Sequence, residues 1–115
     1  MTKSLYQRMT IVRGIRVKKN KKALLDKLEI AKQILIREFH PKKIILFGSL
    51  AHGKEVHPFS DIDLVVEGLG DNYLKAGGRL IDEVGECIDL KPLEMLEKDF
   101  KEYVLQYGKV IYTLT

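Results

Sequence analysis

Four short, largely apolar runs constrain the fold more than any other feature of this sequence. Each is five or six residues long, and they read KKIILF at 42–47, IDLVV at 62–66, ECIDL at 86–90 and KVIYTL at 109–114. Runs of this length and composition are typical of strands that are at least partly buried. The segments between them are either helical in period or rich in turn residues. The sequence therefore predicts an α/β or α+β chain built on a small sheet.

Three segments repeat apolar residues at helical spacing. The first covers 21–39, where apolar positions recur from Leu24 to Phe39 before His40 and Pro41 stop the helix. The second covers 72–84, and the third covers 93–107 and ends at Gly108. The predicted buried face of the second helix consists of Tyr73, Leu74, Gly77, Leu80, Ile81 and Val84. The predicted order is helix, strand, strand, helix, strand, helix, strand, which gives a small mixed sheet flanked by helices.

The 115 residues suit one compact domain, and their charge is divided unevenly along the chain. Residues 1–22 carry eight Lys or Arg and no acid, whereas residues 23–115 carry 12 basic against 16 acidic side chains, a formal charge of −4. We expect a basic arm at 1–22 and a single domain at 23–115. The arm could meet RNA, nucleotide phosphates or an acidic partner, but a solvated arm is favoured because no aromatic-rich RNA motif accompanies the charge.

The sequence favours a protein of the cytoplasm. The first ten residues lack the apolar core of a signal peptide, and no apolar run approaches the ~20 residues that span a bilayer. Cys87 is the only cysteine, so no internal disulfide can form, and a reducing compartment is expected. We read Cys87 as a buried structural thiol, and no membrane partner is expected.

Two aspartates open the second apolar run. Side chains two apart on a strand share a face, so Asp61 and Asp63 would project together, with their Cα atoms roughly 6 to 7 Å apart. In the alternative interpretation, Asp61 caps the strand and Asp63 pairs with a lysine. Two carboxylates on one face of a buried strand are costly unless a metal or a cationic cluster compensates them. The pair therefore indicates a cation site.

A glycine and a serine end the preceding run. Gly48 permits the close backbone approach that phosphate binding requires, and Ser49 adds a hydroxyl donor. Gly-Ser alone is a weak signal. A strand, Gly-Ser, 11 residues and then Asp-Ile-Asp opening another strand form a far more specific pattern.

This pattern, GSLAHGKEVHPFSDID, resembles the minimal nucleotidyltransferases of the DNA polymerase β-type superfamily, and the resemblance extends over about 24–114. The family places a third carboxylate on a neighbouring strand, and Asp89 in ECIDL is the best match. Glu86 would lie on the opposite strand face. The alternative for Asp89 is an exposed aspartate at a strand end. The sequence departs from the family pattern in its 11-residue spacer and in Leu50 and His52, where relatives often carry arginine.

The resemblance implies a palm-like nucleotidyltransferase fold and a two-metal mechanism. Asp61, Asp63 and Asp89 would hold two Mg²⁺ ions, while Gly48, Ser49 and Lys54 would contact the phosphates. The implied reaction transfers AMP from ATP to a hydroxyl of a separate acceptor. Minimal members are paired with a helical HEPN toxin, and the implied role is an antitoxin that adenylylates a tyrosine of that partner.

Two other functions stay open at this point. One is a palm-fold binding module that neutralises or regulates a partner by contact, with weak or no turnover. The other is an RNA-binding accessory that uses the basic arm, whose affinity for RNA would depend strongly on salt.

Overall fold

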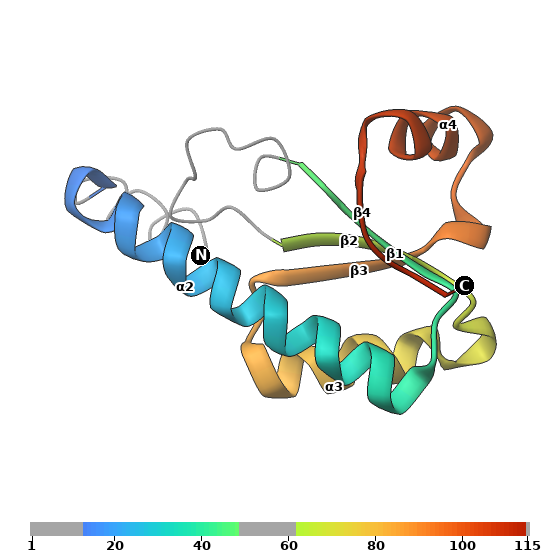
Figure 1. The fold of residues 1–115 in the computed structure, drawn as a ribbon, viewed down its shortest axis with the longest axis horizontal. Helices are drawn as coiled ribbons and strands as arrows, with labels where there is room; N and C mark the ends of the chain where they lie inside the picture. Colours follow the sequence, from blue (N-terminus) through green and yellow to red (C-terminus); the bar gives the residue numbers. More distant parts are fainter. Residues whose placement is uncertain (1–12, 49–61, 115) are drawn as a thin grey trace, which may run out of the picture.

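The computed structural model describes residues 13–48 and 62–114, with their side chains from Lys21 onward. Its helices and strands follow one another in the predicted order (Figure 1). In chain order they are α2 (Arg13–Ile34), the π-helical turn η1 (Leu35–Phe39), β1 (Lys43–Phe47), β2 (Ile62–Glu67), the 3₁₀ turn η2 (Gly70–Asn72), α3 (Tyr73–Val84), β3 (Ile88–Pro92), the 3₁₀ turn η3 (Leu93–Met95), α4 (Lys98–Tyr107) and β4 (Lys109–Thr113).

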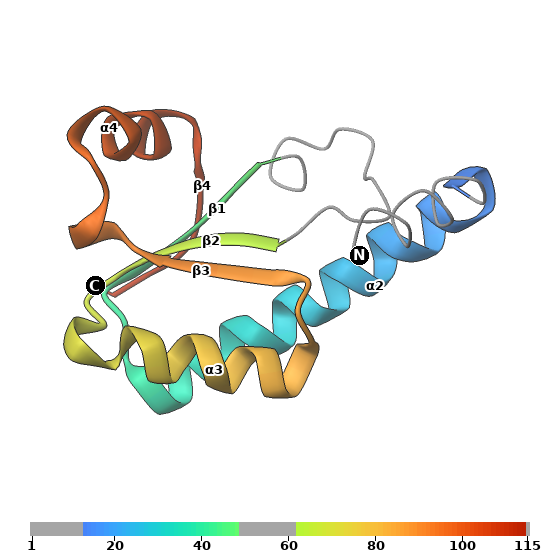
Figure 2. The same ribbon diagram turned by 180° about the vertical axis from the view of Figure 1, so that it is seen from behind.

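The four strands form one mixed sheet in the order β3-β2-β1-β4. β1 is antiparallel to both β2 and β4, whereas β2 and β3 are parallel. The parallel pair is possible because α3 provides the crossover from β2 to β3. The end of β1 and the starts of β2 and β3 consequently lie at the same end of the sheet, as both views show (Figures 1 and 2).

The sheet has a core on each face, and the two cores differ in size. α2 and α3 cover one face, where alternate strand residues such as Ile44, Leu46 and Leu64 join the larger core (Figure 1). η3 and α4 cover the other face, where Ile45 and Val65 join a smaller core. This alternation follows from the period of two along a strand.

The first helix begins earlier than the sequence predicted. Helical structure starts at Arg13, eight residues before 21, and ends at Phe39 as expected. Among the side chains described, which begin at Lys21, the first buried one is Leu24, and Lys21, Lys22 and Ala23 are exposed. The helix stops where His40 adopts a left-handed conformation, φ 52°, and donates its N–H to the carbonyl of Leu35 at 3.1 Å.

The second helix forms as predicted, but part of its buried face was wrong. Leu80 and Val84 are buried, and Ala76 joins them. Leu74 is 73% exposed and Ile81 is 43% exposed. The buried stripe steps by four residues through positions 76, 80 and 84, so Leu74 and Ile81 lie beside it rather than on it.

The third predicted helix is interrupted. η3 ends at Met95, Leu96 and Glu97 are extended, and α4 begins at Lys98. The break redirects the chain, because η3 packs against β2 whereas α4 packs against β1. Gly108 ends α4 as predicted and donates its N–H to the carbonyl of Val104 at 2.7 Å. Throughout the part of the chain described above, helices long and apolar enough to cross a membrane are absent.

Candidate functional site

A row of three side chains crosses the sheet at the end of β1 and the start of β2 and β3. Phe47 on β1 pairs in register with Asp63 on β2, and Asp63 pairs in register with Asp89 on β3. The three residues therefore share the α4 face of the sheet. Neighbouring strands are about 5 Å apart, so the two carboxylates are carried close enough to act on one ligand. Both aspartates are half-buried.

Gly48 brings the backbone against one of these carboxylates. It follows β1 directly and has φ +91°, a conformation that side chains rarely adopt. A Cβ at this position would lie 2.7 Å from Oδ2 of Asp63. The absence of a side chain at Gly48 thus leaves the space that the Asp63 carboxylate uses.

The carboxylate of Asp89 is engaged by a lysine two residues along the same strand. Nζ of Lys91 donates to Oδ2 of Asp89 and forms an ion pair with it. The side chain of Lys91 is 39% exposed and that of Asp89 is 44% exposed. The strand period places both on one face, so this contact brings a positive charge to the candidate site.

An aromatic pair borders the two carboxylates. Phe47, the register partner of Asp63, meets Phe100 of α4 edge to face, with ring centroids 5.5 Å apart. Both rings pack against the smaller core. The site is therefore bounded on its β1 side by an apolar wall that is fixed to the sheet.

The structure places some of the sequence-predicted residues and leaves others outside its description. Asp63, Asp89 and Gly48 come together at one end of the sheet. Asp61, Ser49 and Lys54 lie in 49–61, outside the described residues, as do Leu50 and His52. Glu86, the rejected alternative to Asp89, lies in the turn before β3 and is exposed.

The described residues fit one side of a site for a hard divalent cation. Two carboxylates on adjacent strands supply the oxygen ligands that Mg²⁺ prefers, and Gly48 leaves room for one of them, that of Asp63. Within 13–48 and 62–114 no group of three or more His, Cys, Asp or Glu is placed to hold a metal. Asp61, the third predicted ligand, lies outside these ranges.

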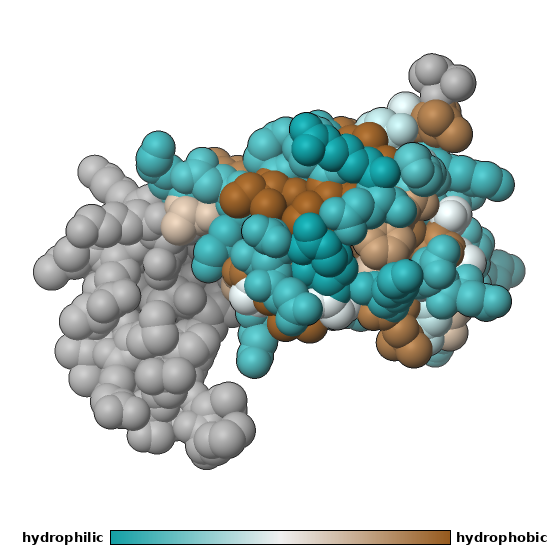
Figure 3. Space-filling view, turned by 90° about the horizontal axis from the view of Figure 1, so that it is seen from below, coloured by the Kyte–Doolittle hydropathy of each residue, from teal (hydrophilic) through white to brown (hydrophobic). Residues whose placement is uncertain are grey.

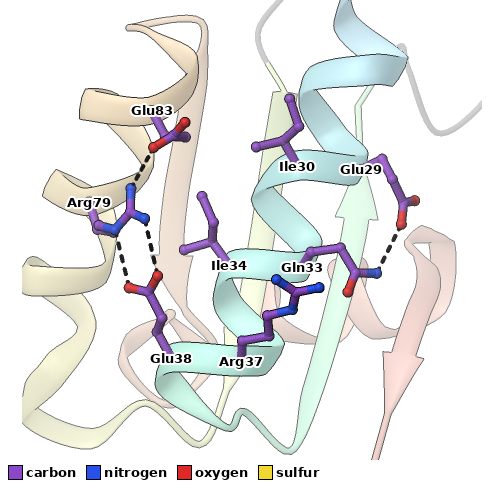
Figure 4. A pocket seen from close by; sticks show the side chains of 8 residues that line it. All are labelled: Glu29, Ile30, Gln33, Ile34, Arg37, Glu38, Arg79 and Glu83. Carbon is purple, nitrogen blue, oxygen red and sulfur yellow. Dashed lines mark hydrogen bonds and ion pairs between the residues drawn. The ribbon is translucent and has the colours of Figure 1, made fainter.

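Another group of charged residues lies on the opposite face of the molecule. A groove of about 330 Å³ runs between α2, η1 and α3, and its lining includes Ile30, Ile34 and Arg37 (Figure 4).

Arg79 donates to Glu38 at 3.1 Å through two nitrogens and to Glu83 at 2.8 Å. The bonds to Glu83 and Glu38 raise the pKa of Arg79. Seen from this side, apolar surface forms a strip among hydrophilic residues (Figure 3). The pair with Glu38 joins η1 to α3, the pair with Glu83 lies within α3, and the groove lies away from Asp63 and Asp89.

Sequence reasoning missed Lys91. The sequence carried the signal for it, because Lys91 follows Asp89 by two positions on a predicted strand and so had to share its face. The predicted run ended at Leu90, whereas β3 continues to Pro92. Phe100 was predicted only as an apolar position of a helix.

Comparison with known proteins identifies the class. Residues 29–114 match the family model described as polymerase beta, nucleotidyltransferase, which spans more than half of the chain and all four strands. The chain therefore belongs to this nucleotidyltransferase family. A comparison with curated proteins finds no match.

Solved structures share the fold. A chain in a crystal structure of a toxin–antitoxin with AMP-PNP is 26% identical, with a TM-score of 0.61, over 76% of this chain and 74% of that one. A structure described as a minimal nucleotidyltransferase is 22% identical, with a TM-score of 0.58, over 77% of this chain and 93% of that one. A complex of a tri-AMPylated HEPN toxin with an MNT antitoxin from Shewanella oneidensis gives 23% identity and a TM-score of 0.54, over 80% and 73%. These likenesses support the resemblance to minimal nucleotidyltransferases.

Proposed function

We propose that this protein transfers AMP from ATP, with Mg²⁺, to a hydroxyl group of a separate protein acceptor. The observation that carries the proposal is the row of Asp63 and Asp89, in register on parallel strands with Gly48 against Asp63, in a chain of the nucleotidyltransferase family. The proposed division into a basic arm at 1–22 and a transferase domain at 23–115 keeps this row within the domain.

Each site residue has a part in the proposed reaction. Asp63 and Asp89, with Asp61, hold the divalent cations, which neutralise charge on the triphosphate and on the leaving pyrophosphate. Gly48 and Ser49 present backbone and hydroxyl donors to the β and γ phosphates, and Lys54 adds a positive charge. Phe47 and Phe100 form a wall that limits water beside Asp63.

The proposed step is a substitution at the α phosphorus of ATP. The acceptor oxygen forms a bond to the α phosphorus of ATP while the bond from that phosphorus to the bridging oxygen breaks. Pyrophosphate leaves, and the hydroxyl proton passes to the carboxylate of Asp89, which acts as a general base. Asp89 suits this part because it is half-exposed on an edge strand, where an incoming acceptor can reach it.

The acceptor we propose is a tyrosine of a helical toxin of the HEPN type. The support comes from the solved structures, where similar chains occur in toxin–antitoxin complexes, one with AMP-PNP and one with an AMPylated HEPN toxin. This protein would act as the antitoxin of such a pair. ATP, Mg²⁺ and the lone reduced Cys87 are all consistent with the cytoplasm as the place of action.

A transfer assay with α-labelled ATP tests this proposal. The intact protein, Mg²⁺ and a HEPN protein from the same cells should give a labelled HEPN band that survives denaturing electrophoresis. Asp63→Asn should lower labelling by at least about 100-fold, since one charged ligand is lost while the fold is kept. Asp71→Asn, an exposed aspartate before α3, is the matched control and should label normally. Equal labelling by wild type and Asp63→Asn would contradict the proposal.

A second function has a specific observation in its favour. Lys91 already pairs with Asp89, and Leu50 and His52 replace residues that are often arginine in relatives, which suits a binding module without turnover. Such a module would bind and neutralise its partner equally well with and without the Asp63→Asn substitution, and it would transfer no label.

A further inference from the structure

Lys91 holds a position that the proposed function does not use. It lies on β3 in register with Val65 of β2, one row further along the sheet than Asp63 and Asp89. Its ammonium group reaches back along the strand to the carboxylate of Asp89. Asp89 is the acid with which Lys91 pairs among the described residues.

Other acids close in sequence are already engaged or face elsewhere. Glu94 accepts the N–H of Gly68 at 2.8 Å, and Glu83 pairs with Arg79 on the far side of the molecule. The described ion pair of Lys91 is with Asp89, and that carboxylate is a candidate metal ligand.

The ammonium group of Lys91 and a metal ion cannot both bind the carboxylate of Asp89 without repelling each other. The ammonium group occupies Oδ2, and a divalent cation at the same carboxylate would lie within a few ångströms of it, where like charges repel. The pair is partly exposed, and exposed ion pairs change an equilibrium constant by no more than about fivefold. Lys91 can thus be displaced, but its displacement lowers the net affinity for the metal.

We propose that Lys91 competes with the divalent cation for Asp89 and so weakens metal binding in the nucleotide-free protein. Lys91 is then a positioning residue, because it holds Asp89 on β3 until a metal replaces its ammonium group. This inference rests on the proposed function, since it takes Asp89 as a metal ligand.

Binding of Mn²⁺ in the absence of nucleotide tests the competition. Free Mn²⁺ is measured by electron paramagnetic resonance during titration of the full chain. Lys91→Met keeps the length of the side chain and removes its charge, and it should tighten Mn²⁺ binding about three- to fivefold. Lys91→Arg keeps the charge and should bind as the wild type does. Lys75→Met, which removes an exposed charge from α3, should leave the affinity within about twofold.

A double-mutant comparison separates competition at Asp89 from a general charge effect. In an Asp89→Asn background, Lys91→Met should change the Mn²⁺ affinity by less than about twofold, because the shared carboxylate is gone. The same three- to fivefold gain in that background would overturn the proposal.

The remaining outcomes distinguish this inference from the proposed function. Wild type and Lys91→Met binding Mn²⁺ equally well would overturn the competition and leave the proposed metal site intact. Weaker binding by Lys91→Met would also overturn it. Failure of both proteins to bind Mn²⁺ at millimolar concentration would overturn both proposals, provided thermal unfolding shows that each protein is folded.

Discussion

Gly48 shows how one residue without a side chain sets the position of a charged group. Gly48 has φ +91°, and a Cβ at this position would lie 2.7 Å from Oδ2 of Asp63. The backbone turns away from β1 immediately beside the carboxylate, and nothing but hydrogen can occupy that side. We read Gly48 as a determinant of where Asp63 points.

Gly48→Ala should weaken binding of Mg²⁺ and ATP by at least about tenfold, because the new methyl group must displace the Asp63 carboxylate. Isothermal titration measures the loss. Gly85→Ala is the matched control, because Gly85 has a similar φ, +97°, and nothing within 4 Å of its would-be Cβ. Both substitutions introduce backbone strain of about 1 to 2 kcal/mol. Equal binding by the two variants would show that contact with Asp63 does not matter.

At the residue scale, the spacing of the sequence and the family resemblance contributed different residues. Asp63 was selected because it shares a strand face with Asp61, and Asp89 because the resemblance implies a third carboxylate on a neighbouring strand. The sheet places Asp63 and Asp89 in register. Their role as metal ligands stays a prediction. The engagement of Asp89 by Lys91 depends on where β3 ends, and a one-dimensional pattern locates strand ends poorly.

At the element scale, apolar patterns in the sequence predict helix boundaries less well than strand boundaries. The helix predicted from 21 starts at Arg13, because apolar periodicity locates the buried face of a helix and not the residue at which the helix begins. The helix predicted over 93–107 breaks at Leu96, because tertiary packing sends η3 to β2 and α4 to β1. The strands were predicted to within about two residues, since their apolar runs are bounded by Gly, Pro or charged residues.

Gly108→Ala should destabilise the domain by about 1 to 3 kcal/mol, because close packing at the junction of α4 and β4 leaves no space for a methyl group. A Cβ at Gly108 would lie 2.4 Å from Cγ2 of Ile45 and 2.5 Å from the carbonyl oxygen of Val104. Urea unfolding measures the change. Gly78→Ala in α3, with nothing within 4 Å, should instead stabilise by up to about 1 kcal/mol. Two shifts of the same sign would contradict this account of the glycines.

Removal of residues 1–22 should change the free energy of unfolding by less than about 1 kcal/mol. From Lys21 onward the first buried side chain of α2 is Leu24, so the shortened chain keeps every side chain that the structure describes as buried. Urea unfolding of the truncated and full chains makes the comparison. A loss of several kcal/mol would show that the arm belongs to the folded domain.

On the scale of the whole molecule, the two faces of the sheet differ in their cores. The face under α2 and α3 carries the larger core, and the ion pair of Arg79 with Glu38 joins α3 to η1 on its outside (Figure 4). The α4 face carries the smaller core and the half-buried row of Phe47, Asp63 and Asp89. The proposed metal ligands thus lie on the face opposite the larger core, so variants at the carboxylates should keep the fold.

The most direct test of the central claim is calorimetric titration of ATP with Mg²⁺ into the intact protein and into an Asp61→Asn, Asp63→Asn double variant. The account predicts that the intact protein binds ATP only when Mg²⁺ is present, and that the double variant loses this binding while its thermal unfolding stays close to that of the wild type. ATP binding that is the same in both proteins, or that needs no divalent cation, would contradict a metal-dependent nucleotide site at the start of β2.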